Sequence, residues 1–551
     1  MKTNKTIRCF MAVIALVLSI VLFCGFSASA ADYDNDWDDE YDGTEYNVKI
    51  IDNVVYELFD WGKYAKNPQY VVMTFGATKE IRRQMTQINI VSEIDGIPVT
   101  RILGEDGYSF HPVSVYPNVK EITIPDSVKR IESYCFTRLI NLEKITLSKN
   151  LTYLGEQAFY NLKNLKEVVI PKGIEIIRTG TFKKCTGLQK VTFLGDVAYI
   201  SDFAFANCTS LKSVSPLKKL KSIDRKAFYN CRSLKNFEFP ATIKSIGSAS
   251  FENSGLTSVK IPAGPVLDHS TSDLDSTPYY GAQFRGCKNL KSVVFEDTKK
   301  KIEIPFDCFN NCPALKTVVF PKSSKEIVLS PGAFGGSGLT SIKLPSSIVF
   351  EKEVTGDDVS PECYDGAQFK NCKKLKKVVF ESTKKEIEIP NDCFAGCTAL
   401  KTVVLPKSAK ELTLCTRAFS GCTALKAVEN SGMITEIYPG AFKNCKSLET
   451  IKFSSRIKRI CRKAFLGCSN LKSITFKDTK NVPGYKYNSK TNKSNGKFDK
   501  ETFSGTPSNM KFFVKNATVA KKLKTALKGS GVKNARIYSI SGKTLYYKNV
   551  K

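Results

Sequence analysis

One phenylalanine recurs along most of the chain at nearly constant intervals. Successive copies are 23 residues apart in seven places, 25 apart in four, and 33, 35 and 38 apart in the other three. The copies are Phe136, Phe159, Phe182, Phe205, Phe228, Phe251, Phe284, Phe309, Phe334, Phe369, Phe394, Phe419, Phe442, Phe465 and Phe503. A period of this length predicts one long array of stacked units, although 551 residues alone would suggest several globular domains.

Each unit carries the same order of local signals. The segment 158–171 begins as a tight turn, continues as a short apolar strand and ends at Pro171, and Ile174 and Ile177 then form a second apolar pair. A strand of about five residues cannot bury its inner face alone, so neighbouring units must stack about 4.8 Å apart. The pattern predicts a β-rich solenoid of about 15 to 16 coils with short strands, short helical turns and terminal caps.

The units repeat one pattern of residues, in the order Ala, Phe, Cys, Leu, Val, Ile and Pro. This pattern resembles the BspA-type leucine-rich repeat of secreted and surface proteins of bacteria and some protists. The resemblance extends from about Ile94 to Met510, and the segment 93–100 resembles the first coil of that family. It implies a leucine-rich-repeat arc used for adhesion or binding, and it brings no catalytic residues with it.

The first 30 residues have the pattern of a secretory signal peptide. Lys2, Lys5 and Arg8 precede an apolar run, and small residues at 28–30 form a cleavage site. The apolar run is about 14 residues long, whereas a membrane-spanning helix needs about 20, so we expect cleavage. The sequence therefore predicts a secreted or extracellular protein, associated with the cell surface or released, with no transmembrane segment after cleavage.

Four further segments follow the predicted signal peptide. Residues 31–47 are rich in Asp and Glu and are expected to form a disordered acidic tail. Residues 48–109 are expected to form the N-terminal cap and first coil, and 110–509 the repeats. Residues 510–551 are expected to close the last coil as a C-terminal cap.

Three insertions, at about 262–282, 345–367 and 477–501, lengthen the repeat. The first two open the copies of a duplicated three-coil block, in which Phe284 precedes Phe369 by 85 residues. They are read either as functional loops or as tolerated insertions. The third is rich in lysine and is expected to be a mobile basic flap.

Ten cysteines lie three positions after the repeat phenylalanine. They are Cys185, Cys208, Cys231, Cys287, Cys312, Cys372, Cys397, Cys422, Cys445 and Cys468. Secretion and the coil spacing would both allow disulfides. However, the series breaks into runs of three, two and five, and the same position holds Leu139 and Ser254 in other coils, so we expect small, buried, free thiols.

The sequence predicts neither an enzyme nor a cofactor. His111 and His269 are the only histidines, so neither a zinc site nor a base for a Ser or Cys nucleophile is evident. A glycan hydrolase needs only two carboxylates and stays as a distant alternative, with Asp357 and Asp358 of the second insertion as candidates.

Lysine placement carries the main functional hypothesis, because 83 basic against 53 acidic residues give a net charge of +30. A lysine directly follows the repeat leucine in nine coils. These residues are called the lysine line: Lys166, Lys212, Lys235, Lys291, Lys316, Lys376, Lys401, Lys426 and Lys472. The line either keeps strand edges soluble or binds a polyanion. It lacks interleaved aromatic residues, so sequence-specific nucleic-acid binding is not expected.

Small residues at outward strand positions are expected to form a flat concave binding face beside the lysine line. They are Thr146, Val169, Thr192, Val294, Thr317, Val319, Val379, Thr402, Val404 and Thr450. A face without a pocket suits a protein or polymer better than a small molecule.

The sequence therefore predicts a secreted binding protein, namely a bacterial surface adhesin for a host extracellular protein, mucin or anionic glycan. The alternative is an envelope structural protein that docks electrostatically on the producer's own anionic wall polymer.

Overall fold

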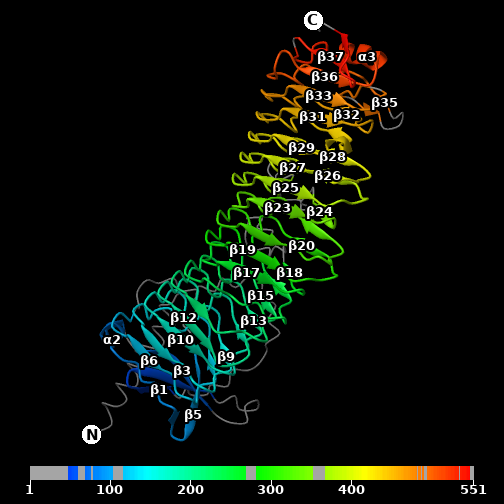
Figure 1. The fold of residues 1–551 in the computed structure, drawn as a ribbon. Helices are drawn as coiled ribbons and strands as arrows, with labels where there is room; N and C mark the ends of the chain where they lie inside the picture. The colour runs from blue at the N-terminus through cyan, green and yellow to red at the C-terminus, as the bar shows by residue number, and fades with distance from the viewer. Residues whose placement is uncertain are drawn as a thin grey trace, which may run out of the picture.

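The computed structural model describes residues 48–59, 69–75, 79–103, 116–267, 281–351, 366–480, 482–485, 487–488, 493–532 and 534–546. The chain forms one elongated solenoid whose N-terminal strands and C-terminal helix lie at opposite ends (Figure 1). Most coils contribute one strand to a first line and a shorter strand to a second line, and the first line is interrupted between β14 and β17, where residues 235–239 form no strand. The predicted signal peptide and acidic tail, His111, His269, Asp357 and Asp358 lie outside the described residues.

The first line consists of parallel strands stacked coil on coil. They are β6 (Glu121–Thr123), β8 (Lys144–Thr146), β10 (Glu167–Ile170), β12 (Lys190–Phe193), β14 (Ser213–Val214), β17 (Ser258–Ile261), β19 (Ser292–Phe295), β21 (Thr317–Val319), β23 (Ser341–Leu344), β25 (Lys377–Phe380), β27 (Thr402–Val404), β29 (Ala427–Glu429), β31 (Thr450–Phe453), β33 (Ser473–Phe476), β36 (Lys511–Val514) and β37 (Arg536–Ser539). Alternation buries every second side chain, as in β10, where Val168 and Ile170 point inward.

The second line is parallel as well. Its strands are β7 (Arg130–Ile131), β9 (Tyr153–Leu154), β11 (Ile176–Ile177), β13 (Tyr199–Ile200), β15 (Ser222–Ile223), β16 (Ser245–Ile246), β18 (Val266–Leu267), β20 (Ile302–Ile304), β22 (Ile327–Leu329), β24 (Ile348–Phe350), β26 (Ile387–Ile389), β28 (Leu412–Leu414), β30 (Glu436–Ile437) and β32 (Arg459–Ile460). A short 3-10 helix, η1 (Ser431–Met433), precedes β30.

Both ends of the stack are closed by additional elements. At the N-terminal end β1 (Val48–Ile51), β2 (Val54–Phe59) and β3 (Gln69–Phe75) form an antiparallel meander, followed by α2 (Lys79–Gln84), β4 (Glu93–Ile94) and β5 (Ile97–Ile102). At the C-terminal end α3 (Ala517–Leu527) packs beside β36 and β37, and β38 (Thr544–Tyr546) pairs antiparallel with β37. Neither described helix is long and apolar enough to cross a membrane.

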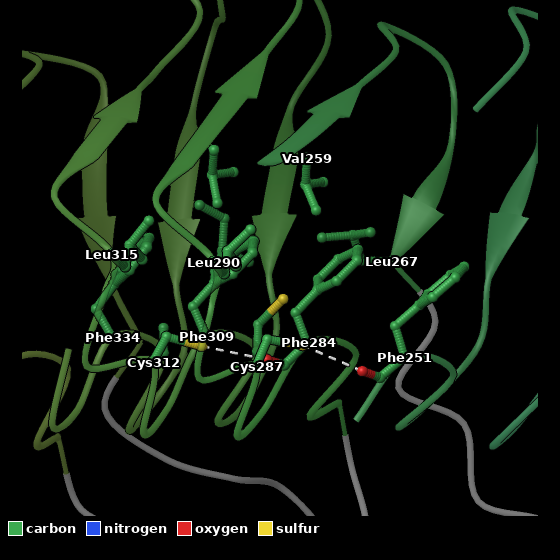
Figure 2. Close-up of a cluster of buried hydrophobic side chains, with 14 of the residues drawn as sticks. Phe251, Val259, Leu267, Phe284, Cys287, Leu290, Phe309, Cys312, Leu315 and Phe334 are labelled. Atoms are coloured by element: carbon green, nitrogen blue, oxygen red, sulfur yellow. Dashed lines mark hydrogen bonds between the residues drawn. The ribbon is translucent and has the colours of Figure 1, made fainter. Parts of the chain in front are cut away.

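The fifteen repeat phenylalanines form an unbroken column in the core. Every ring is fully buried, and neighbouring ring centroids lie 5.0 to 5.7 Å apart in stacked pairs. Figure 2 shows part of this column, from Phe251 to Phe334. The stacking continues across the first two insertions, because Phe251 and Phe284 are 5.6 Å apart and Phe334 and Phe369 are 5.5 Å apart. The insertions therefore leave the core intact.

The third insertion forms a short hairpin and contacts the core in its described parts. Residues 487–488 and 493–494 pair as the short hairpin β34 (Tyr487–Asn488) and β35 (Lys493–Ser494). Val482 and Phe498 are buried, and the Phe498 ring packs edge-on against Phe503. The mobility of the segment stays a prediction, while two of its apolar side chains pack into the core although the segment is otherwise rich in lysine.

The ten cysteines of the repeat are buried and free, as expected. Each thiol also lies within hydrogen-bond distance of the carbonyl oxygen of the phenylalanine in the preceding coil, for example Cys287 Sγ to Phe251 O at 3.2 Å (Figure 2). The thiol is a second, weak donor to a carbonyl that already accepts a backbone hydrogen bond, as Phe251 O does from Ser254 N at 3.0 Å. Ser254 and Ser337 occupy the same position in other coils, and their hydroxyl oxygens lie 3.2 Å from the thiols of Cys287 and Cys372.

We expect the buried thiols to resist alkylation in the native protein. Burial raises the pKa of Cys287 to about 12 and that of Cys461 to about 11, so almost no thiolate is present at pH 8. Mapping of labelled peptides should show labelling of these cysteines at least about 100-fold slower in the native protein than in the unfolded chain. The half-buried Cys135 and Cys415 are the internal comparison. Fast native labelling of Cys287, or a disulfide between two buried cysteines of the repeat, would contradict this expectation.

Candidate binding surface

The exposed side of the first line, called the strand face, is a regular surface that runs along the solenoid. Parallel register places equivalent residues of neighbouring coils side by side, so the exposed positions form columns that run along the solenoid. Val169 pairs with Thr192, and Val294 with Val319. A ligand that lies along the solenoid therefore meets the same kind of position once per coil.

All ten residues predicted for the binding face lie on the strand face. Thr146, Val169, Thr317, Val319 and Thr450 are exposed. The other five are half-buried: Thr192, Val294, Val379, Thr402 and Val404. Whether they contact a ligand stays a prediction.

The same columns contain residues that the prediction omitted. Lys260 is the register partner of Val294, and Lys343 is the partner of Val379. Each of these lysines forms an ion pair of 2.6 Å, Lys260 with Glu296 and Lys343 with the equivalent Glu381. The duplicated blocks therefore carry the same charged pair on the strand face, interrupting the expected row of small residues.

The nine residues of the lysine line are all exposed, and all except Lys235, whose coil has no first-line strand, directly precede a first-line strand. Backbone hydrogen bonds connect members in successive coils: Lys401 N donates to Lys376 O and Lys426 N donates to Lys401 O, each at 2.9 Å. Lys316 N likewise donates to Lys291 O. The line thus contains one run of three lysines and one run of two that are joined by these bonds, each spaced by a single coil of about 4.8 Å. Lys212 and Lys235 also occupy successive coils, 23 residues apart.

The lysine line is interrupted where other residues occupy the same position. Lys212 Nζ donates to Gln189 Oε1 at 2.9 Å, and Lys472 forms a 3.0 Å ion pair with Glu449. In contrast, no described residue forms an ion pair with Lys376, Lys401 or Lys426. Like charges at this spacing repel one another, so the run of three is a place where a bound anion lowers the electrostatic energy.

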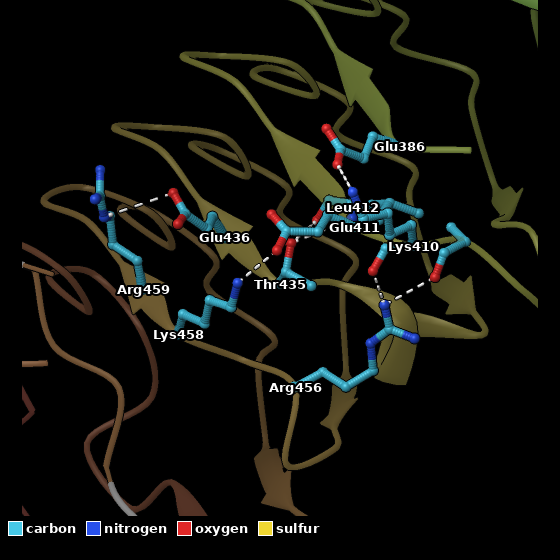
Figure 3. Close-up of polar contacts among 10 residues, drawn as sticks. Glu386, Lys410, Glu411, Leu412, Thr435, Glu436, Arg456, Lys458 and Arg459 are labelled. Atoms are coloured by element: carbon cyan, nitrogen blue, oxygen red, sulfur yellow. Dashed lines mark hydrogen bonds and ion pairs between the residues drawn. The ribbon is translucent and has the colours of Figure 1, made fainter. Parts of the chain in front are cut away.

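The second line is organised differently near β26 to β32, because several of its cations there form ion pairs with residues of neighbouring coils. Figure 3 shows Lys410 paired with Glu386 at 2.8 Å and Lys458 paired with Glu411 at 2.6 Å. Arg456 reaches back to donate to the Ala409 carbonyl oxygen at 2.8 Å. Unpaired positive charge therefore distinguishes the run of Lys376, Lys401 and Lys426 from these paired cations of the second line.

The described residues offer little for chemistry or metal binding. Within them, no group of three or more His, Cys, Asp or Glu side chains is placed to hold a metal ion. An open hollow beside β6 is lined by Gln87, Asn89, Glu121, Thr123 and other residues, but it brings together no nucleophile and base.

The stacked strands, the phenylalanine column and the flat strand face define a leucine-rich-repeat solenoid. The family model of the BspA type leucine rich repeat region matches six copies, over 114–217, 198–266, 279–353 and 365–495, which is more than half of the chain. The protein belongs to the BspA-type leucine-rich-repeat family. The expected fold class and the family resemblance are both confirmed.

Several solved structures resemble this chain. A leucine-rich repeat protein from Bacteroides ovatus is 19% identical, with 89% of this chain and 99% of that chain covered and a TM-score of 0.47. One from Eubacterium ventriosum is 20% identical, with 62% and 83% covered and a TM-score of 0.33. A leucine rich cell surface protein from Faecalibacterium prausnitzii is 18% identical, with 92% and 99% covered and a TM-score of 0.27. No curated protein matches the chain.

Proposed function

We propose that the protein is a secreted bacterial adhesin that binds a negatively charged host protein or glycan across its strand face. Proteins of this family are typically surface or secreted proteins of bacteria that serve as non-enzymatic binding scaffolds. The observation that carries the proposal is the run of Lys376, Lys401 and Lys426, which is exposed and unpaired among the described residues beside a flat strand face. A broad face next to a line of charge suits an extended ligand.

The second candidate function is electrostatic docking on the producer's own anionic wall polymer. It is favoured by the regular spacing of the lysine line, which matches a polymer of repeated charge without requiring a shaped pocket. The two functions differ in their response to salt. Binding to a polymer by charge alone should fall steeply between about 50 and about 500 mM NaCl, whereas a shape-matched host ligand should retain more of its affinity.

The test compares retention of the secreted chain on the producer's cell walls with retention on fibronectin, fibrinogen and mucin at both salt concentrations. Salt-resistant binding to one host ligand would support the adhesin. Binding to walls alone that disappears at high salt would replace the adhesin with the docked envelope protein.

The lysine run itself is tested by the triple variant Lys376→Gln, Lys401→Gln, Lys426→Gln. We expect affinity for the anionic ligand to fall about tenfold or more at low salt, and the dependence of log K on log salt to weaken by roughly 2 to 3. The matched control replaces three lysines that already have carboxylate partners, Lys219, Lys410 and Lys458, with glutamine. Equal losses in both triples would indicate dependence on net charge alone and would contradict a binding role for this run.

A further inference from the structure

The C-terminal end of the strand face differs from the rest in carrying two aromatic side chains. Parallel register aligns Lys452, Thr475, Phe513 and Tyr538 in one column across β31, β33, β36 and β37. Among the described outward positions of the first line, only Phe513 and Tyr538 are aromatic. The small or charged residues of the other coils therefore give way to rings in β36 and β37. These two strands lie at the C-terminal end of the solenoid (Figure 1).

The two rings form a platform on the outside of the cap. Their centroids are 5.5 Å apart with an interplanar angle of 25°, and both side chains are half-buried. The core beneath is filled by other residues of the same strands, since Phe512, Val514 and Ile537 are almost fully buried. Phe513 and Tyr538 thus keep solvent-accessible ring surface in a cap whose core is already packed.

Positive charge flanks this platform. Lys511 and Arg536 lie two positions earlier in the same strands, are register partners and are exposed. Lys452 is exposed in the aromatic column. None of the outward positions of β31, β33, β36 and β37 carries a carboxylate. The platform therefore combines an apolar ring surface with exposed cations on the same strands.

We propose that this platform binds one sugar ring of an anionic glycan whose chain continues along the lysine line. One face of a pyranose ring presents C–H groups, which suit the negative face of an aromatic ring. Lys511 and Arg536 meet the sulfate or carboxylate groups of the sugar, and Arg536 brings a planar donor group that fits such anions. The inference rests on the proposed function, and it specifies that the ligand of the strand face is an acidic polysaccharide.

Single-stranded nucleic acid is the competing ligand for aromatic rings beside cations. Proteins that bind it offer successive stacking platforms along a basic groove. This strand face offers one pair of rings at one end. The described outward positions of its other strands carry no aromatic ring. An anionic glycan needs only one stacked ring to fix its register, because its repeated charges are met by separate lysines.

The experiment measures dissociation constants by calorimetry at about 150 mM NaCl for the protein and the double variant Phe513→Thr, Tyr538→Thr. Threonine already occupies the same column as Thr475, so the strand should tolerate it. The probes are a chondroitin sulfate hexasaccharide, an unsulfated uronic-acid oligosaccharide from bacterial walls, polyphosphate and oligo-dT. We expect the double variant to bind the preferred oligosaccharide about 10- to 100-fold more weakly and polyphosphate equally well.

Two further variants separate stacking from charge and from a general effect of aromatic residues. Lys511→Gln should weaken binding of every anionic probe, because it removes charge and leaves the rings. Tyr199→Thr removes an exposed aromatic residue of the second line, which has Lys221 over its ring at 5.7 Å, and should leave every constant unchanged. A preference for the sulfated probe would indicate a host glycan as the source, and a preference for the wall oligosaccharide would indicate the producer's envelope.

The outcomes that overturn the inference differ from those that overturn the proposed function. If the double variant, with an unchanged melting temperature, binds both oligosaccharides like the wild type, the platform is not a sugar site, whatever the lysine triple shows. If oligo-dT alone binds and depends on the rings, the ligand class is wrong. If neither the lysine triple nor the platform variants alter binding to any probe or host ligand, the proposed function fails together with the inference.

Discussion

Replacing Phe309 with alanine is expected to lower the free energy of unfolding by about 3 to 5 kcal/mol. The ring is fully buried and lies between the rings of Phe284, at 5.3 Å, and Phe334, at 5.4 Å. Alanine would leave a cavity in the middle of the column. Backbone hydrogen bonds, such as Phe309 N to Ala333 O at 2.8 Å, fix the distance between neighbouring coils. The coils therefore cannot close in on the cavity.

Urea denaturation followed by circular dichroism measures this loss, and hydrogen exchange locates it. Because each coil contacts mainly its neighbours, we expect faster exchange around Phe284 to Phe334 before the ends of the solenoid change. The control is Val319→Ala, which removes a 44% exposed side chain from the strand face of the adjacent region and should cost less than about 1 kcal/mol. Equal costs for the two variants would show that the column is not the main source of stability.

The repeat period alone predicts the features that depend on register. Residues one repeat apart become neighbours in space, so the burial of every repeat phenylalanine and the alignment of the lysine line follow from counting. The same count would have shown that Lys472 faces Glu449, 23 residues earlier. It would equally have shown that Lys376 faces Lys401, and so which lysines keep unpaired charge.

The features that the sequence did not predict involve a broken period or an atom-level contact. The aromatic platform was missed because 38 residues separate Phe465 from Phe503, so the cap strand β36 has no fixed offset from the preceding repeats. The burial of Val482 and Phe498 in the segment 477–501 was missed because the lysine content outweighed these two apolar residues. The thiol contacts depend on side-chain rotamers, which composition does not specify.

Replacing Arg285 with methionine is the second change expected to cost about 3 to 5 kcal/mol of folding free energy. Its guanidinium lies 2.9 Å from Glu252 Oε1 and 3.6 Å from Asp307 Oδ2, and both carboxylates are largely buried. Asn310 Nδ2 donates to Asp307 Oδ1 at 2.6 Å. Methionine would keep the packing of the side-chain stem but leave two buried negative charges without their cation.

The duplicated block supplies a matched control for this variant. Lys370 stands 85 residues after Arg285, and Asp392 stands 85 residues after Asp307. Lys370 is more exposed and lies 3.7 Å from Asp392, which also has Arg417 at 2.7 Å. Lys370→Met should therefore cost less than about 1 kcal/mol. A similar cost for both variants would show that the Arg285 cluster is no more important than an ordinary surface pair.

The pH dependence of the Arg285→Met variant gives a further check, with a definite sign. Burial raises the pKa of Asp307 above its ordinary value, while Asn310 and Arg285 act in the opposite direction. Removing Arg285 raises that pKa further, so the folded variant holds a proton more tightly than the unfolded chain does. The loss of folding stability caused by the buried Asp307 charge is complete above the pKa of Asp307 in the folded variant. It disappears as the pH falls toward the pKa of Asp307 in the unfolded chain, about 4. The stability difference between wild type and variant should thus narrow from pH 7 to pH 4, and a difference independent of pH would exclude the buried charge as its cause.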